Sequence, residues 1–190
     1  MKKICVFCGS NYGAKLVYSE VAQYLGRLIA EKGFTLVYGA GNVGLMGEIA
    51  NSVLAHKGKV IGVMPKNLVD KEIAHQSLTE LHVVYSMHER KALMAELSDA
   101  FIALPGGFGT FEEFFEVVTW SQLGIHKKPC GVLNVDGFYD SLLKLIENAV
   151  AEQFIRKENA ELILSDSDPD ILLHKIKNWN PVFIDKWISK

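Results

Sequence analysis

The 190-residue chain lacks any long apolar run. Hydrophobic residues nevertheless make up 49% of the chain, so we do not expect it to be disordered. No stretch approaches the roughly 20 consecutive apolar residues that a membrane-spanning helix needs, so we expect no membrane partner. The apolar stretch Ile4–Cys8 follows two lysines, as in a secretory leader, but it stops at Gly9 and is too short for one. We interpret it as a buried first strand.

The chain also lacks an excess of either charge and has few cysteines. Its formal net charge of −2 provides no basic field, which argues against nucleic acid as a partner. Cys5, Cys8 and Cys130 cannot all pair with one another, and each lies in an apolar run. Cys5 and Cys8 have the spacing of a metal-binding pair, but on a strand they point to opposite faces. We interpret all three as core thiols rather than a redox or metal site, and we expect a cytoplasmic location.

Short apolar runs alternate with amphipathic stretches along the chain. Strands are expected at 3–8, 35–39, 59–64, 81–84, 100–104, 130–135 and 162–164, and helices at 19–32, 45–57, 87–98, 111–123, 138–152 and 169–177. Near-continuously apolar strands are typical of a parallel sheet with helices on both faces. The sequence therefore predicts one α/β domain over residues 1–190, with a Rossmann-like, doubly wound parallel sheet.

Glycine-rich loops follow the first two predicted strands, at the sheet edge where ligands of such folds bind. Ser10 lies in the first loop, and Gly41 and Gly44 belong to the second, 39–44, which matches the G-x-G-x-x-G pattern of a dinucleotide site. The acidic residue expected about 20 positions further on is absent, because the next strand ends in Met64-Pro65. We therefore favour loops that support another ligand over an NAD site, with a purely structural turn as the alternative.

A third glycine-rich loop, Pro105–Thr110, is followed at once by a predicted helix. Its three glycines free the backbone to point N–H groups inward, and the helix N-terminus adds a partial positive charge. No lysine follows the glycines, so this is not a Walker A loop. A helix cap is the simpler alternative, because Thr110 and Glu113 have capping-box spacing. We predict a phosphate-binding loop, since three such loops are expected at one sheet edge.

Two cationic residues lie near the N-terminus of the predicted helix 87–98, where their charge opposes the helix dipole. Ser86 and Glu89 have capping-box spacing, which places Arg90 and Lys91 in or beside the first turn. On a helical projection Arg90 falls at the centre of the apolar arc, and Lys91 lies at its flank. A charge that faces the core must be paired or contact a ligand. We expect Arg90 to meet a phosphate or a catalytic carboxylate, with a structural ion pair as the alternative.

The predicted helix 111–123 is apolar over most of its surface but carries carboxylates near its start. Glu112, Glu116 and Thr119 form one narrow stripe, and Glu113 lies beside it. Carboxylates on an otherwise buried helix at an anion-binding loop indicate acid–base chemistry or stabilisation of a cation. If Glu113 caps the helix, it cannot catalyse in the same rotamer. The six histidines show no metal-ligand spacing and no G-x-S-x-G motif is present, so we expect neither a metal nor a serine nucleophile.

Two paired motifs are similar to those of a known family. Residues 105–113 read PGGFGTFEE and fit the motif PGGxGTxxE, and the Arg-Lys pair stands about one strand upstream. With Cys8–Ser10, 39–47 and 120–129, the chain from Ile4 to about Ile155 resembles the Lonely guy (LOG) family. Its members are cytokinin riboside 5′-monophosphate phosphoribohydrolases, formerly labelled lysine decarboxylases. Asn11 stands where many members have a second serine.

The resemblance implies an enzyme without a cofactor that hydrolyses a nucleoside 5′-monophosphate, of cytokinin type or with adenine, to free base and ribose 5-phosphate. It implies that Glu113 stabilises the oxocarbenium-like charge on the ribose and activates water, and that Arg90 orients Glu113 and the substrate. It also implies a homodimer. The substrate-binding residues that it implies are Glu72, Arg90, Lys91, Gly106, Gly107, Phe108, Gly109, Thr110, Phe111, Glu112 and Thr119.

Two other functions are alternatives. A pyridoxal-phosphate decarboxylase needs a lysine in an apolar strand-end setting with an acidic partner for the ring nitrogen, and no lysine of the chain has that setting. A non-catalytic nucleotide or cofactor carrier would use the same fold, since a fold alone does not decide function. Arg90 and Glu113 together favour the enzyme.

Overall fold

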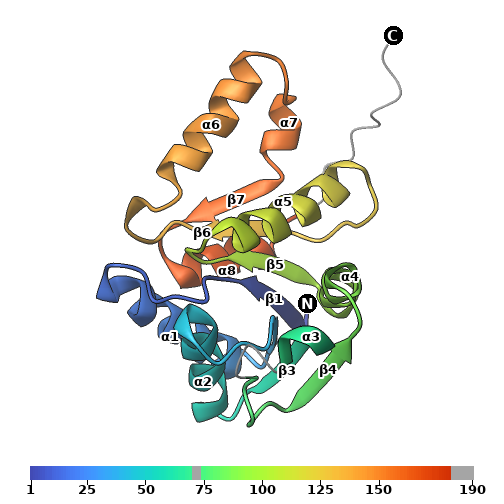
Figure 1. The fold of residues 1–190 in the computed structure, drawn as a ribbon. Helices are drawn as coiled ribbons and strands as arrows, with labels where there is room; N and C mark the ends of the chain where they lie inside the picture. Colours follow the sequence, from blue (N-terminus) through green and yellow to red (C-terminus); the bar gives the residue numbers. More distant parts are fainter. Residues whose placement is uncertain (70–73, 181–190) are drawn as a thin grey trace.

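The computed structural model describes residues 1–69 and 74–180, which form a twisted sheet covered by helices (Figure 1). Seven parallel strands lie in the order β4-β3-β2-β1-β5-β6-β7. The chain proceeds outward from β1 to β4 and then crosses back to β5 on the other side of β1. The predicted doubly wound parallel sheet is therefore confirmed, and its switch point lies between β1 and β5, where such folds bind ligands.

The predicted elements all occur in the predicted order, with differences at their ends and two additional short helices. The strands are β1 Lys3–Phe7, β2 Thr35–Tyr38, β3 Lys59–Pro65, β4 Glu80–Val84, β5 Ala100–Ala103, β6 Cys130–Leu133 and β7 Ile163–Asp166. The helices are α1 Leu16–Glu31, α2 Gly44–Ala55, α3 Lys66–Val69, α4 Met87–Leu97, α5 Phe108–Gln122, α6 Asp140–Ala151, α7 Lys157–Ala160 and α8 Pro169–Lys177, with a 3₁₀ turn at Val135–Gly137. The short α3 and α7 were not predicted, because four residues carry no helical periodicity.

Two hydrophobic clusters cover the two faces of the sheet. Ile4 and Val6 of β1 belong to the cluster under α1, α2 and α8, whereas Cys5 and Phe7 belong to the cluster under α4 and α5. The alternation arises because successive strand residues point to opposite faces. Cys8 joins the first cluster, so Cys5 and Cys8 are separated by the sheet as predicted.

All three cysteines are unpaired and buried, as expected for core thiols. Burial raises the pKa of the Cys130 thiol to about 12, and it raises the pKa of Cys5 and Cys8 as well. A thiol held protonated in this way is a poor nucleophile. The cysteines therefore contribute packing rather than reactivity.

Candidate functional site

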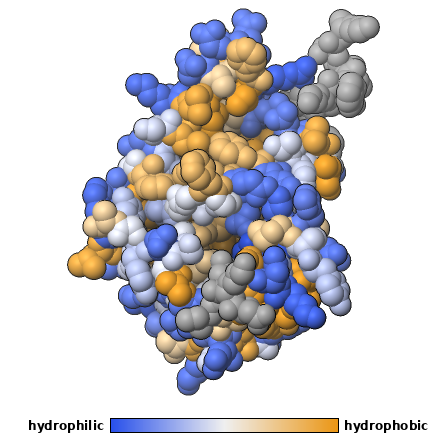
Figure 2. All heavy atoms as spheres, in the orientation of Figure 1, coloured by the Kyte–Doolittle hydropathy of each residue, from blue (hydrophilic) through white to orange (hydrophobic). Residues whose placement is uncertain are grey.

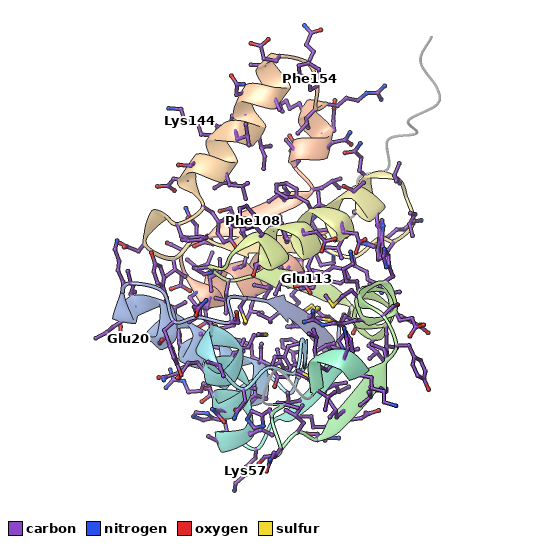
Figure 3. All side chains as sticks on the ribbon, viewed as in Figure 1. Glu20, Lys57, Phe108, Glu113, Lys144 and Phe154 are labelled. Carbon is purple, nitrogen blue, oxygen red and sulfur yellow. The ribbon has the colours of Figure 1, made fainter. Side chains whose placement is uncertain are left out.

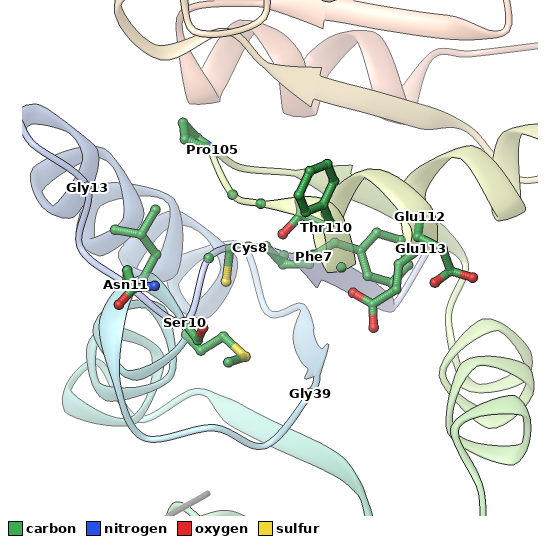
Figure 4. A pocket seen from close by; sticks show the side chains of 18 of the residues that line it. Phe7, Cys8, Ser10, Asn11, Gly13, Gly39, Pro105, Thr110, Glu112 and Glu113 are labelled. Carbon is green, nitrogen blue, oxygen red and sulfur yellow. The ribbon is translucent and has the colours of Figure 1, made fainter.

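A pocket of about 410 Å³ opens at the carboxyl edge of the sheet, beside the switch point (Figure 4). The loop after β1 contributes Ser10, the loop after β2 contributes Gly39, and the loop after β5 together with the first turn of α5 contributes Pro105–Thr110. Arg90 from α4 and Glu113 from α5 complete its polar wall. The three glycine-rich loops thus meet at one edge of the sheet, as the strand order requires.

The loop Pro105–Thr110 turns directly into α5. Gly107 is the N-cap residue, and no side chain caps this helix. The alternative interpretation, a capping box between Thr110 and Glu113, does not occur, because the helix begins at Phe108 and Glu113 already lies in its second turn. The N–H groups of the first turn therefore have no capping side chain and lie at the pocket, which is the arrangement that binds anions in other proteins.

The glycines of this loop are not equivalent. A Cβ atom on Gly106 would lie 2.1 Å from Thr110 Oγ1 and 2.9 Å from the Gly9 backbone nitrogen, so only glycine fits there. A Cβ atom on Gly107 or Gly109 would meet nothing within 4 Å. Gly106 therefore permits the close packing of the loop against the β1 loop, while the other two leave open space at the pocket.

Arg90 and Glu113 face each other from α4 and α5. Arg90 Nη1 lies 3.3 Å from Glu113 Oε1, and each side chain is 11% exposed. Arg90 Nε also donates a hydrogen bond of 3.2 Å to the Val63 carbonyl oxygen on β3. Figure 3 labels Glu113 beside α5, and Figure 4 shows its side chain leaving the helix toward the loops of the sheet edge. The two residues predicted to be catalytic are thus brought together in the pocket wall.

The Glu113 carboxyl is subject to opposing influences. Its burial raises the pKa, the Arg90 guanidinium lowers it, and the net shift is upward from the ordinary value of a glutamate. Lys91 lowers the pKa as well, whereas Glu112 and Glu116 raise it. A carboxyl of this kind exchanges its proton nearer to neutral pH than an exposed glutamate does, which suits acid–base chemistry.

Lys91 is not part of the pocket wall. Its ammonium group pairs with Glu112 and lies 3.1 Å from Glu116 Oε1 on α5. Burial lowers the pKa of Lys91, but the hydrogen bonds to these two carboxylates outweigh it and the net shift is upward. Lys91 therefore stays charged and, next to the Arg90–Glu113 pair, ties α4 to α5.

The other predicted substrate-binding residues divide into three groups. Gly106–Thr110 and Glu112 line the pocket with Arg90. Phe111 and Thr119, like Lys91, are absent from its wall, and the exposed Thr119 hydroxyl donates to the Phe115 carbonyl oxygen. Glu72 lies outside the described residues.

The residues predicted to support the phosphate loop also differ in role. Ser10 lines the pocket, but Gly41 and Gly44 do not. Gly44 has a φ of +64°, and a Cβ atom there would lie 2.3 Å from the Ser10 carbonyl carbon, so this glycine lets α2 approach the β1 loop. Gly41 packs against Met46, where a Cβ atom would lie 2.6 Å from Cε. The two glycines therefore let loops pack closely beside the pocket.

Several residues of the pocket wall escaped the sequence analysis. Tyr12, Tyr18, Met46, Met87 and Phe138 give it an apolar part, and the rings of Tyr18 and Phe138 meet edge to face with centroids 6.0 Å apart. Met46 lies in the 39–47 motif and Met87 precedes the Arg-Lys pair, but nothing in these motifs marks either side chain as lining a pocket. Only their tertiary arrangement identifies them.

Fold and pocket together define a Rossmann-like α/β protein with an arginine–carboxylate pair beside a glycine-rich helix N-terminus. The profile of a family described as "Possible lysine decarboxylase" matches residues 46–176. A cytokinin riboside 5′-monophosphate phosphoribohydrolase of Arabidopsis thaliana is 49% identical over 189 residues, which covers 100% of this chain and 88% of the relative. One of Oryza sativa subsp. japonica is 48% identical over 182 residues, covering 96% and 75%. The chain belongs to the LOG family.

Solved structures share the fold at lower identity. The molybdenum cofactor binding protein of Rippkaea orientalis superposes with a TM-score of 0.70 at 24% identity, covering 93% of this chain and 96% of that one. The molybdenum cofactor carrier protein of Chlamydomonas reinhardtii gives 0.69 at 20% identity, with coverage of 93% and 96%. At these identities the likeness shows the fold alone.

The described part of the chain contains neither a candidate metal site nor a candidate membrane-spanning helix. Within residues 1–69 and 74–180, no group of three or more His, Cys, Asp or Glu side chains is arranged to hold a metal ion. In the same ranges, no helix has the length and apolar character needed to cross a membrane.

Proposed function

We propose that this protein hydrolyses the N-glycosidic bond of a nucleoside 5′-monophosphate, with a cytokinin-type base or adenine, and releases the free base and ribose 5-phosphate. The observation that carries this proposal is the Arg90–Glu113 pair in the wall of a pocket that also contains an uncapped helix N-terminus. Relatives with about half of their residues identical are named for this activity.

The phosphate is proposed to bind the loop 106–110. Backbone N–H groups at the start of α5 and the positive end of the helix dipole favour a group with negative charge. Binding there fixes the ribose at a constant distance from Glu113, which lies in the next turn of the same helix. The enzyme would therefore prefer monophosphates to nucleosides.

Glu113 is proposed to act on the ribose. Cleavage of the glycosidic bond develops positive charge at C1′, and an ionised carboxylate stabilises that charge and accepts a hydrogen bond from the attacking water. The water oxygen bonds to C1′ as the bond to the base breaks, and the proton of the water ends on the base nitrogen. Arg90 keeps Glu113 ionised and oriented.

Further parts of the proposal rest on the family resemblance. Glu72, Lys91, Phe111 and Thr119 are proposed as substrate-binding residues, although the latter three do not line the pocket of the single chain. The protein is proposed to be a cytoplasmic homodimer that uses neither nucleic acid nor a membrane.

The experiment incubates the protein with AMP, with isopentenyladenosine monophosphate and with the corresponding nucleosides, without added metal or cofactor. Chromatography should reveal free base and ribose 5-phosphate from the monophosphates. Binding of a nucleotide without turnover would favour the carrier function instead. Carbon dioxide released from lysine would contradict the proposal.

A further inference from the structure

Gly39, the first residue after β2, lies beside the guanidinium of Arg90. A Cβ atom at this position would lie 1.9 Å from Arg90 Nη2 and 3.1 Å from its Cζ, whereas ordinary van der Waals contact begins at 3.4 Å. Figure 4 shows Gly39 on the loop toward which the Glu113 carboxylate extends. The absence of a side chain at position 39 is therefore what gives the guanidinium its space.

We infer that Gly39 is a positioning residue for the proposed hydrolysis, and that it acts by leaving the space in which Arg90 is held against Glu113. The inference rests on the proposed function, because Arg90 and Glu113 are its catalytic pair. It also accounts for the first glycine of the 39–44 pattern, which resembles a dinucleotide fingerprint. Here that glycine accommodates an arginine side chain.

The guanidinium lies between three parts of the fold. Nε donates to the Val63 carbonyl oxygen of β3, Nη1 lies against Glu113 of α5, and Nη2 faces Gly39. To move from 1.9 Å to the 3.4 Å of ordinary contact, Nη2 must shift by about 1.5 Å relative to a methyl group at position 39. Such a shift strains or breaks the contact with Val63 or the contact with Glu113.

The fold itself tolerates alanine at this position. Gly39 is not among the residues with positive φ, so its backbone conformation is accessible to alanine. The next nearest atom to a Cβ is Met46 Sδ at 3.5 Å, an ordinary contact. Since the clashing atom is the end of a flexible side chain, Gly39→Ala should displace Arg90 and leave the sheet intact.

Displacement of Arg90 changes the charge balance at Glu113. The groups that act on Glu113 are Arg90 and Lys91, which lower its pKa, and Glu112 and Glu116, which raise it. Cys5 and Cys8 of β1 also interact with Glu113, but burial raises their pKa and keeps them neutral. Without Arg90 in place the pKa of Glu113 rises, and the ionised form required at the ribose appears only at higher pH.

The test compares wild type, Gly39→Ala, Arg90→Ala and the double variant in nucleotide hydrolysis across pH. Gly39→Ala should lower kcat by about 100-fold, the scale of a catalytic group misplaced by about 1 Å, with a smaller change in KM. The acidic limb of the pH–rate profile of Gly39→Ala should move to higher pH. In the Arg90→Ala background the same substitution should have little further effect, because the methyl group then meets no guanidinium. Gly131→Ala on β6, outside the pocket wall, should retain the wild-type rate and pH profile.

A readout independent of turnover separates this inference from the proposed function. The Glu113 carboxyl is titrated by NMR in wild type and in Gly39→Ala, with its signal assigned by its absence in Glu113→Gln. A higher pKa in Gly39→Ala supports the positioning role even if no nucleotide is hydrolysed, an outcome that would remove only the proposed function. The inference would be overturned by an unchanged Glu113 pKa in Gly39→Ala. It would also be overturned if the losses of kcat in Gly39→Ala and Arg90→Ala added in the double variant, since the methyl group would then act on the substrate alone.

Discussion

At the scale of single residues, the question about Arg90 and Glu113 is whether they catalyse or only stabilise the fold. Glu113→Gln should lower kcat by about 100-fold or more, because the neutral amide cannot stabilise a cation or take a proton. Folding should survive, since the amide oxygen can still accept from Arg90. Glu116→Gln on the same helix is the matched control, because Glu116 pairs with Lys91 outside the pocket wall. A Glu113→Gln variant with a lower melting temperature and full turnover would make the pair structural.

The raised pKa of Glu113 also predicts how stability depends on pH. Because the folded state binds this proton more tightly than the unfolded state, the contribution of Glu113 is greatest in acid and declines as pH rises through its folded pKa. The stability of Glu113→Gln lacks this decline, because the amide does not titrate, and the loss of the negative charge beside Arg90 changes its stability by an amount that does not depend on pH. Relative to Glu113→Gln, the wild type should therefore lose free energy of unfolding as pH rises from acid toward neutral. Urea denaturation at a series of pH values measures this difference, and the opposite slope would contradict the assignment.

At the scale of elements, the start of α5 is the part that should recognise phosphate. Gly106→Ala places a methyl group 2.1 Å from Thr110 Oγ1 and should distort the loop. We expect kcat/KM for the monophosphate to fall tenfold or more, about 1.4 kcal/mol or more in transition-state binding. Turnover of the unphosphorylated nucleoside, which makes no phosphate contact, serves as the internal control. An equal loss with both substrates would indicate general damage to the pocket rather than loss of phosphate recognition.

At the scale of the whole molecule, exposed apolar side chains remain on helices that the single chain does not cover. Phe115 is exposed on α5, Leu123 is exposed directly after the helix ends, and Leu145 is exposed on α6. Figure 2 shows apolar side chains at the surface over these helices. Sedimentation equilibrium should give about twice the chain mass of 21.1 kDa, and Leu123→Glu should shift it toward the monomer. A monomeric wild type would contradict the proposed homodimer.

The sequence by itself was sufficient to predict the parallel sheet and the glycine-rich loops at its edge. Continuous apolar strands alternating with amphipathic helices specify a parallel sheet, because each pattern reflects a local backbone period. The loop Pro105–Thr110 could also be recognised in the sequence, because its glycines stand directly before a helix. Arg90 could be recognised because it is a cation that faces the core near a helix N-terminus. The predicted helix ends were less accurate: α5 was expected to begin at residue 111 and begins at Phe108, which rules out the capping box considered as an alternative for Glu113.

Only the tertiary structure decided which groups meet. Arg90 and Glu113 lie on different helices, and their contact depends on how α4 and α5 pack on one face of the sheet. The same packing pairs Lys91 with Glu112 and Glu116, and it brings Gly39 from the loop after β2 against the guanidinium. Local sequence carries the period of each element, but contacts between elements depend on strand order, register and side-chain volume. Those quantities are properties of the folded chain as a whole, which is why the sequence identified the chemical groups and the fold determined their partners.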